Sequence, residues 1–304
     1  METLKNIEYL ATNPDPNFKD KGRSYPNILL KATQLFFQYI GPIIPNTAAK
    51  IAYRLFATPR GRAEHKVSDA ILESARLFEV LYGRQILKAY EWGKGEKTIL
   101  LVHGWESRGT AMRSFVPALV ENGYRVVAFD GPAHGNSDGK RTNLPHFSGA
   151  VRAMVRQVGE VEAVISHSFG GVSSVFAFAT DEDMPWLNKL VLIGVPNRLD
   201  SVLNDAATIL KVPKSVNRKF RAIIQSKINL PIDEANMTDI GKKLKLGEAL
   251  IVHDQNDAIV PFAAAQMTFE AWENAQLVAV DGLGHYRLMK HPAVVKRVVN
   301  FIID

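Results

Sequence analysis

From residue 75 onward, short runs of valine, isoleucine and leucine alternate with longer segments that place their apolar residues on one helical face. The short runs predict strands, and the longer segments predict helices. This alternation is typical of an α/β fold with a mostly parallel sheet and helices on both faces. The first two runs flank Tyr82-Gly83, which predicts an antiparallel hairpin at one edge. The expected strands are residues 75–81, 85–92, 97–102, 125–129, 161–165, 189–195, 248–253 and 275–280, and the expected helices are residues 110–121, 144–158, 263–273 and 293–303.

Residues 1–65 follow a different pattern, and we expect a helical extension that packs on the core formed by residues 66–304. The extension mixes apolar, aromatic and basic side chains. Two other interpretations therefore stay open: peripheral contact with a membrane surface through these helices, or packing against a second subunit in a homodimer. The expected elements are a turn at residues 13–17, a helix at 27–40, a break at Gly41-Pro42 and a second helix at 46–56.

The alternation is interrupted between Val195 and Glu248, a gap of about 50 residues that is too long for an ordinary connection. We expect residues 197–246 to form a helical cap over the carboxyl ends of the strands, where active sites of open α/β sheets lie. The cap is rich in positive charge, which indicates either a solvated helix face or attraction of an anionic substrate or acidic lipid. These basic residues are Lys211, Lys214, Arg218, Lys219, Arg221 and Lys227.

Composition narrows the function classes. The 304 residues contain no cysteine, which excludes disulfides, thiol catalysis and cysteine-bound metals, and which fits a reducing compartment. The first residues lack the layout of a secretory signal, and no run of about 18 uncharged apolar residues is present, so we expect a cytoplasmic protein. The net charge of +6 is moderate, and no nucleic-acid-binding signature accompanies it.

The strand expected at 161–165 runs directly into a cluster of small residues around Ser168. A strand that turns at once into a helix strains the residue at the turn and exposes its side chain, and small residues two positions away relieve the crowding. Ser166 and Gly170 occupy those positions, although the motif of such a nucleophile elbow has glycine at the first. The alternative is an ordinary serine- and glycine-containing loop.

A serine nucleophile needs a histidine base and an acid that orients the imidazole. His285 lies in a glycine-rich segment after the last expected strand, where it would be free to reach back over the sheet. Two aspartates, Asp254 and Asp257, follow the strand at 248–253, and either could supply the acid.

The other histidines are expected to be structural. His103 and His134 would stabilise loops by hydrogen bonds, His253 would be a packed core residue, and His291 opens the last helix. The sequence contains neither a metal-binding motif such as H-E-x-x-H nor a glycine-rich phosphate loop, so we expect no metal and no cofactor.

The order Ser168, Asp257, His285 and two further segments resemble the α/β-hydrolase superfamily over residues 70–304. Leu101–Trp105 is similar to the HG turn after the third strand of that family, and Asp130–Asp138 is similar to its D-x-x-G-x-G-x-S loop. The resemblance implies an α/β-hydrolase fold of the serine-nucleophile branch with a helical cap. It favours Asp257 over Asp254, because the family places its acid just before an x-x-V-P run.

By the same resemblance, Ser168 attacks an acyl carbonyl, His285 takes its proton, and Asp257 orients His285. The backbone N–H groups of Trp105 and Phe169 would form the oxyanion hole. The expected function is hydrolysis of a small-molecule carboxylic ester through an acyl-enzyme. A thioesterase, an acyltransferase or a non-catalytic ligand-binding protein on the same fold remains an alternative, because motifs do not encode the shape of the pocket.

Overall fold

A nine-stranded sheet forms the body of the protein in the computed structural model, which describes residues 5–12, 27–61 and 69–304. The order across the sheet is β1-β9-β8-β7-β6-β4-β5-β3-β2. All neighbouring strands are parallel except the pairs β2–β3 and β3–β5. The strands are β1 (Ile7–Tyr9), β2 (Arg76–Tyr82), β3 (Gln85–Trp92), β4 (Thr98–Val102), β5 (Arg125–Phe129), β6 (Val161–His167), β7 (Leu187–Ile193), β8 (Leu246–Asp254) and β9 (Ala275–Val280).

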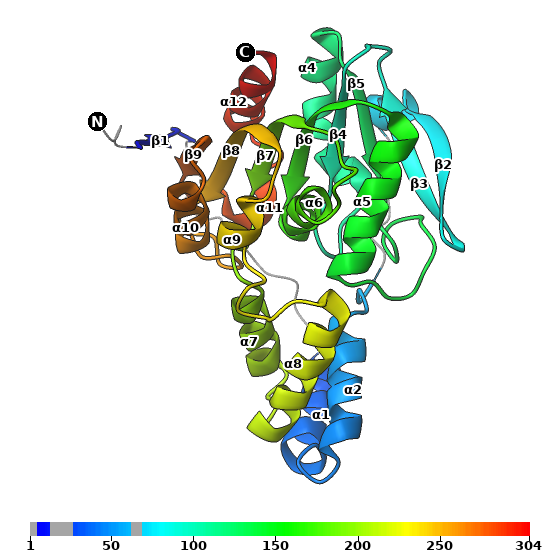
Figure 1. Cartoon of the computed structure of the whole chain (residues 1–304), viewed down its shortest axis with the longest axis vertical. Helices are drawn as coiled ribbons and strands as arrows, with labels where there is room; N and C mark the ends of the chain where they lie inside the picture. The colour runs from blue at the N-terminus through cyan, green and yellow to red at the C-terminus, as the bar shows by residue number, and fades with distance from the viewer. Residues whose placement is uncertain (1–4, 13–26, 62–68) are drawn as a thin grey trace.

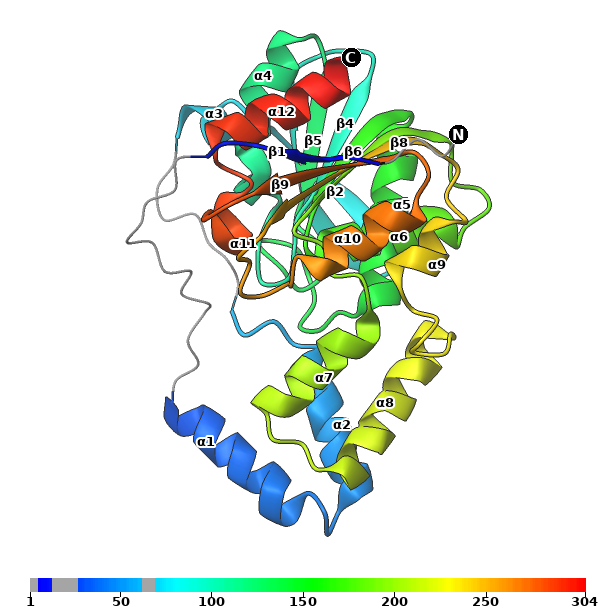
Figure 2. The same ribbon diagram turned by 90° about the vertical axis from the view of Figure 1, so that its left-hand side faces the viewer.

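Helices cover both faces of this sheet (Figures 1 and 2). The helices α5 (Leu144–Val158), α6 (Phe169–Ala179) and α10 (Ala263–Ala271) lie on one face. The 3₁₀ turn η2 (Gly109–Phe115), α4 (Val116–Glu121) and α12 (Pro292–Ile303) lie on the other. The arrangement confirms the predicted fold class, a mostly parallel sheet between two helical layers.

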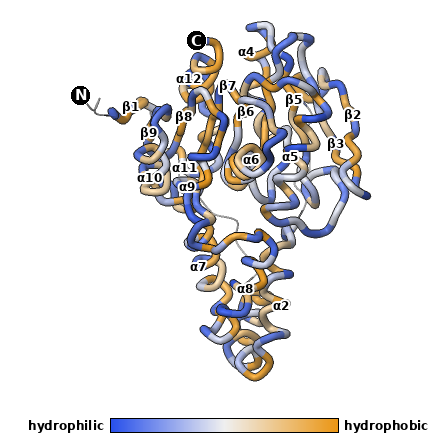
Figure 3. The backbone as a smooth tube through the Cα atoms, in the orientation of Figure 1, coloured by the Kyte–Doolittle hydropathy of each residue, from blue (hydrophilic) through white to orange (hydrophobic). Residues whose placement is uncertain are grey.

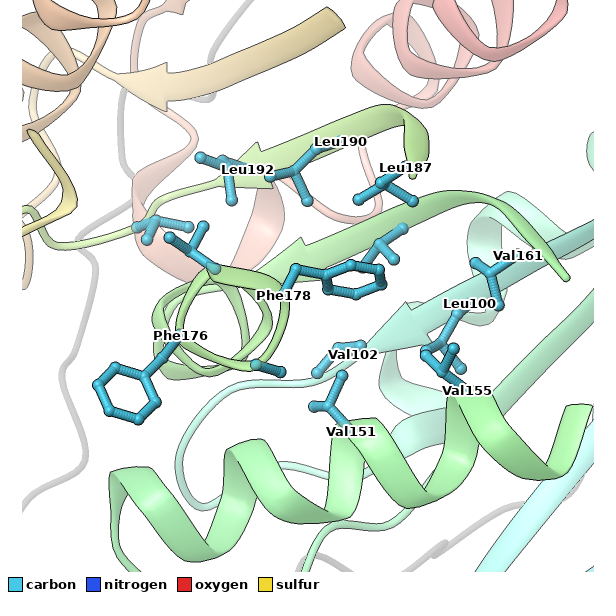
Figure 4. Close-up of a cluster of buried hydrophobic side chains, with 14 of the residues drawn as sticks. Leu100, Val102, Val151, Val155, Val161, Phe176, Phe178, Leu187, Leu190 and Leu192 are labelled. Atoms are coloured by element: carbon cyan, nitrogen blue, oxygen red, sulfur yellow. The ribbon is translucent and has the colours of Figure 1, made fainter. Parts of the chain in front are cut away.

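Alternate residues of each central strand enter opposite cores. In β4, Leu100 and Val102 pack toward α5 and α6, whereas Ile99 and Leu101 pack toward η2 and α4. Figure 4 shows the first of these cores, in which Val151 of α5 and Phe178 of α6 lie beside strand residues. Because both faces are buried, the strand contains only apolar residues after its first position, and this is why continuous apolar runs predicted the strands correctly.

Two local features differ from the sequence prediction. The segment expected to be one helix at 110–121 begins as a 3₁₀ turn and becomes α-helical at Val116, with Pro117 in the first turn of α4, where its missing N–H needs no acceptor. No pattern in the sequence predicted β1. Its three residues pair in parallel with β9, with Ile7 opposite Leu277, and so extend the edge of the sheet.

The cap consists of α7 (Leu199–Ile209), α8 (Lys214–Ile228) and the short α9 (Met237–Gly241). Of the N-terminal helices, η1 (a π-helix, Phe36–Ile40) and α2 (Pro45–Phe56) pack on this cap rather than on the sheet (Figure 1). The preceding α1 (Asn27–Leu35) leads into η1 and contacts the cap near its end, through Gln34. We call residues 27–61 and 199–232 together the helical lobe. Its apolar core combines Phe37, Ala48, Ala49 and Ala52 with Leu203, Val216, Phe220, Ile224, Ile228 and Ile232.

The end of α2 also contacts the body. The Thr142 N–H donates to the Ala57 carbonyl at 2.9 Å, and the Asn143 amide donates to the Tyr53 hydroxyl at 3.0 Å. The extension therefore touches both the cap and the body, although its helical core is shared with the cap. The turn expected at residues 13–17 lies outside the described residues. None of the described helices has the length and apolar character needed to cross a bilayer.

Phe220→Ala is expected to weaken the helical lobe as a unit. Phe220 is 2% exposed and packs edge-on against Phe56, with ring centroids 5.6 Å apart, so truncation leaves a cavity between cap and extension. Such a cavity lowers the free energy of unfolding by about 3–5 kcal/mol. Amide hydrogen exchange should accelerate in both α2 and α8, while Leu55→Ala, at a position that is 44% exposed, should leave both helices protected. Acceleration confined to α8 would contradict a shared core.

Candidate active site

Ser168 lies at the turn between β6 and α6, with φ 52° and ψ −124°. Positive φ is rare for residues other than glycine, and it marks the strain expected of a nucleophile elbow. The strain is balanced by local hydrogen bonds. The Ser168 N–H donates to the Ile193 carbonyl at 2.9 Å, and the Ser168 carbonyl accepts from Gly171 at 2.9 Å. Ser168 remains partly exposed.

The residues around Ser168 must be small because the segment that follows β4 lies close to this turn. A Cβ on Gly170 would come within 2.4 Å of the His103 carbonyl oxygen, and a Cβ on Gly104 would come within 3.0 Å of the Ser168 Cβ. Ser166, which replaces the expected glycine, is fully buried. Its hydroxyl donates to the Val191 carbonyl at 2.9 Å, so the extra polar atom is satisfied and the elbow retains its shape.

His285 and Asp257 form a buried hydrogen-bonded pair. The Nδ1–H of His285 donates to Oδ2 of Asp257 at 2.7 Å, and the two residues are 2% and 8% exposed. The other carboxylate oxygen accepts from the N–H groups of Ile259 at 2.8 Å and Val260 at 2.9 Å. Burial raises the pKa of Asp257, but the hydrogen bond and the charge of His285, with these two N–H groups, outweigh burial and lower it. Asp257 is therefore held as a carboxylate.

Asp254, the rival acid, has a different position. Its carboxylate accepts from the N–H groups of Gly284 at 2.9 Å and Asn256 at 2.7 Å, and also from Leu283. It therefore fixes the turn that precedes His285. His285 itself lies in the short helix α11 (Gly284–Arg287) and not in an irregular glycine-rich loop, and its ring contacts Asp257 and His167.

His167 adjoins the pair and was missed by the sequence analysis. Its Nε2–H donates to the His285 carbonyl at 2.9 Å, and the two rings lie 4.7 Å apart. Complete burial is the main cause that lowers the pKa of His167 to about 3, and a positive His285 would lower it further. His167 thus anchors the backbone of His285 as a neutral donor. Its position directly before Ser168 was the only signal in the sequence.

Trp105 and Phe169 lie beside each other, with perpendicular rings whose centroids are 5.4 Å apart. Trp105 follows Gly104, the glycine on which a Cβ would come within 3.0 Å of the Ser168 Cβ. Phe169 is the first residue of α6. The first N–H groups of a helix have no acceptor within the helix, so they are available to an anion. The two residues expected to supply the oxyanion hole are therefore adjacent to the expected nucleophile.

His103 and His134 connect two loops. The Nδ1–H of His103 donates to the Gly104 carbonyl at 2.7 Å, and its Nε2 accepts from the Gly131 N–H at 2.9 Å. His134 donates to the Pro132 carbonyl and accepts from the Glu106 N–H at 3.0 Å. Both positions agree with the expected loop-stabilising role.

Glu106 is a further residue of this region that was not predicted from the sequence; it is 4% exposed and has φ 52°. Its carboxylate accepts two hydrogen bonds from the Arg60 guanidinium, each at 2.8 Å, and one from the Arg60 N–H. The N-terminal extension is thereby joined to the residue that follows Trp105. A pairing across 46 residues leaves no pattern in a single sequence.

The loop at 130–138 is structural. Asp130 accepts from the N–H groups of Gly109 at 2.8 Å and Asn136 at 2.9 Å. Ala133 stands where the D-x-x-G-x-G-x-S pattern has its first glycine, and it adopts φ 66°.

His253 is fully buried and hydrogen-bonds to the Val260 carbonyl, as expected of a core residue. His291 directly precedes α12, the position expected for it.

Among the described residues, no group of three or more histidine, aspartate or glutamate side chains is placed to bind a metal ion. The groups that the site presents are a serine hydroxyl, a histidine paired with a carboxylate, and the N–H groups at the start of α6.

Comparison with known proteins places this geometry in a family context. The sequence pattern described as the alpha/beta hydrolase family matches residues 99–298. The chain is 25% identical over 252 residues to a non-heme chloroperoxidase from Streptomyces lividans, which covers 67% of this chain and 91% of that protein. It is 26% identical over 261 residues to the 2-hydroxy-6-oxononadienedioate/2-hydroxy-6-oxononatrienedioate hydrolase of Escherichia coli K12. That alignment covers 69% of this chain and 88% of the hydrolase.

Solved structures of the same architecture superpose on most of the chain. An esterase from Pyrococcus furiosus matches with a TM-score of 0.62 at 20% sequence identity, over 80% of this chain and 97% of that one. The thioesterase domain from the curacin biosynthetic pathway matches with a TM-score of 0.56 at 16% identity, over 76% of this chain and 99% of that domain. At such identities, these structures support the fold alone.

The buried histidines predict a loss of stability in mild acid. Burial lowers the pKa to about 4 for His103 and about 3 for His134 and His167, against 6.5 in the unfolded chain. Below pH 6.5 the unfolded state binds protons that the folded state excludes, so stability is complete above that pH and falls as the pH drops toward 4. Each histidine contributes a slope of about 1.4 kcal/mol per pH unit. Urea unfolding between pH 8 and pH 4.5 measures this slope, and a free energy of unfolding that stays constant from pH 7 to pH 5 would be incompatible with it.

Proposed function

This chain belongs to the alpha/beta hydrolase family, and we propose that it is a serine hydrolase that cleaves carboxylic esters through an acyl-enzyme intermediate. Family membership itself supports a hydrolase. The serine nucleophile and the ester bond are inferred from the site. The observation that carries the proposal is the buried 2.7 Å hydrogen bond between His285 and Asp257, combined with the strained, partly exposed Ser168.

His285 is the proposed general base. Because its Nδ1–H is engaged by Asp257, the lone pair of the neutral ring lies on Nε2, the nitrogen that can accept the Ser168 proton. The positive imidazolium that forms would be stabilised by the carboxylate, whose lowered pKa keeps it ionised at neutral pH. His285 then returns the proton to the leaving alcohol, and in the second half-reaction it activates the water that releases the acid.

The developing oxyanion is proposed to accept hydrogen bonds from the N–H groups of Trp105 and Phe169. Each such donor contributes about 3–4 kcal/mol to stabilisation of the transition state in related chemistry. The hydrogen bonds of His103, His134 and Glu106 support this arrangement, because they fix the loop that carries Trp105 before substrate binds. Pre-organised donors need no rearrangement at the moment of reaction.

A thioesterase or an acyltransferase would use the same residues. The relatives extend the range of candidate reactions, because one is named a non-heme chloroperoxidase and another a hydrolase of 2-hydroxy-6-oxononadienedioate. We favour hydrolysis over transfer, because release of an acyl-enzyme on Ser168 by water needs no second binding site for an alcohol or a thiol. Product analysis with an added alcohol or thiol distinguishes transfer from hydrolysis, since a transferase would form the new ester in preference to the free acid.

Ser168→Ala is expected to abolish turnover of nitrophenyl esters of short and medium acyl length, with a fall in kcat/KM of at least about 10³-fold. Ser166→Ala is the matched control, because that hydroxyl donates to a strand carbonyl and takes no part in the chemistry. Release of nitrophenol is the measurement. Equal rates for the intact protein and Ser168→Ala would rule out Ser168 as the nucleophile.

Asp257→Asn and Asp254→Asn are expected to separate orientation of the base from support of its loop. Asp257→Asn removes the negative charge beside His285 and should lower kcat by about 10⁴-fold with little effect on folding. Asp254→Asn weakens the hydrogen bonds that hold the turn before His285 and should cost about 1–3 kcal/mol of stability with a smaller loss of kcat. Thermal unfolding and ester kinetics on both variants measure the contrast. The reverse pattern would assign the acid to Asp254.

A further inference from the structure

The helical lobe has an apolar tip. Exposed apolar side chains gather along α1, η1 and the turn before α2, and Figure 3 shows this apolar colouring at the lower end of the molecule. Isolated exposed apolar residues are normal, but a contiguous group marks an interaction surface. We call residues 28–47 the lobe tip. Its large exposed side chains are Ile28, Leu29, Leu35, Tyr39, Ile40, Ile43 and Ile44, with Ile28 85% and Ile43 74% exposed.

The lobe is strongly basic. Residues 27–61 contain four basic residues and no acidic one. Residues 199–230 contain six basic and two acidic residues, and α8 itself has no acidic residue. Together these segments carry a formal charge of +8, against +6 for the whole chain, so the rest of the protein has a net charge of −2. The positive charge of the chain is therefore concentrated in this lobe.

Basic side chains lie next to the apolar tip. The turn between α7 and α8 packs into the same core as Phe36 and Phe37, and Lys211 and Lys214 project from that turn as exposed residues. The Gln34 amide of α1 donates to the Ile209 carbonyl at the end of α7 at 2.8 Å. Lys31 adds a further exposed cation on α1 itself. Apolar residues with flanking cations form the pattern that inserts into the headgroup region of an anionic bilayer.

We propose that the lobe tip docks on the surface of an anionic lipid bilayer. The apolar side chains enter the boundary between headgroups and acyl chains, and the flanking lysines contact lipid phosphates and carboxylates. The tip does not span the membrane.

A second copy of the chain is the main competing occupant, and charge argues against it. A two-fold symmetric interface brings the same surface of both subunits together. Two lobes of +8 would then face each other, whereas an anionic bilayer attracts the same charge. An anionic lipid surface is therefore the complementary partner.

Docking in this way would leave the proposed active site at the base of the lobe, away from the tip that touches the lipid. The cap leaves the sheet at the carboxyl end of β7, on the edge where Ser168 lies, and Arg60 joins the extension to Glu106 beside Trp105. The docking surface is therefore separate from the proposed triad. Ser168→Ala should bind vesicles as the unmodified chain does, so failure of the catalytic proposal and failure of this one are distinguishable.

Vesicle flotation of the full chain tests the proposal. The unmodified protein should float with vesicles of phosphatidylcholine mixed with phosphatidylserine, and binding should fall by at least about ten-fold with phosphatidylcholine alone or in high salt. The double variant Leu29→Ser/Ile43→Ser and the double variant Lys211→Gln/Lys214→Gln should each show a similar loss. All four positions are exposed, so the fold should be retained, which circular dichroism checks.

Leu77→Ser/Leu81→Ser is the matched control for the apolar variant. These leucines are 69% and 75% exposed on the edge strand β2, in the body rather than in the lobe. The control should float as the unmodified chain does. Equal loss in the control, absence of binding to anionic vesicles, or sedimentation as a dimer that Leu29→Ser/Ile43→Ser converts to monomer would overturn the proposal.

Discussion

The strained backbone at Ser168 is the constraint on which the site depends. A residue at φ 52° between a strand and a helix is held there by the Ile193 carbonyl on one side and by the close approach of β4 on the other. That approach in turn requires Gly104 and Gly170 to lack side chains. The central strands are buried on both faces, and their rigid packing supplies the energy that maintains the strain.

Hydrogen bonds from neighbouring residues hold the proposed base in position. His285 is fixed from three directions: Asp257 binds its ring, His167 binds its carbonyl, and Asp254 binds the turn before it. The succession of strands and helices along the body, and the placing of Ser168, Asp257 and His285 after the ends of strands, could be predicted from the sequence, because they follow from local patterns and from chain order. The order of the strands across the sheet was not predicted. His167, Glu106 and Arg60 were not found, because their roles depend on contacts between distant segments. The same reason explains why β1, with three residues and no periodic pattern, was not predicted.

The helical lobe shows where pattern and packing diverge. An amphipathic pattern predicts that one face of a helix is buried, but it does not identify the surface against which that face packs. The sequence therefore did not show that the extension packs on the cap. Phe37 and Phe220 share one core across more than 180 residues of chain, while large apolar side chains of α1 and η1, such as Ile28 and Tyr39, are exposed. The extension is thus connected to the cap, to the loop beside Trp105 through Arg60, and to a surface of concentrated positive charge.

Labelling of the intact protein by a fluorophosphonate, followed by mass spectrometry of its peptides, determines whether Ser168 is an activated nucleophile. The reagent phosphonylates a serine hydroxyl that a neighbouring base has activated. We expect one adduct, on Ser168, that is absent after Ser168→Ala and forms more slowly after Asp257→Asn. An unlabelled protein, or an adduct on another serine that persists in Ser168→Ala, would contradict it.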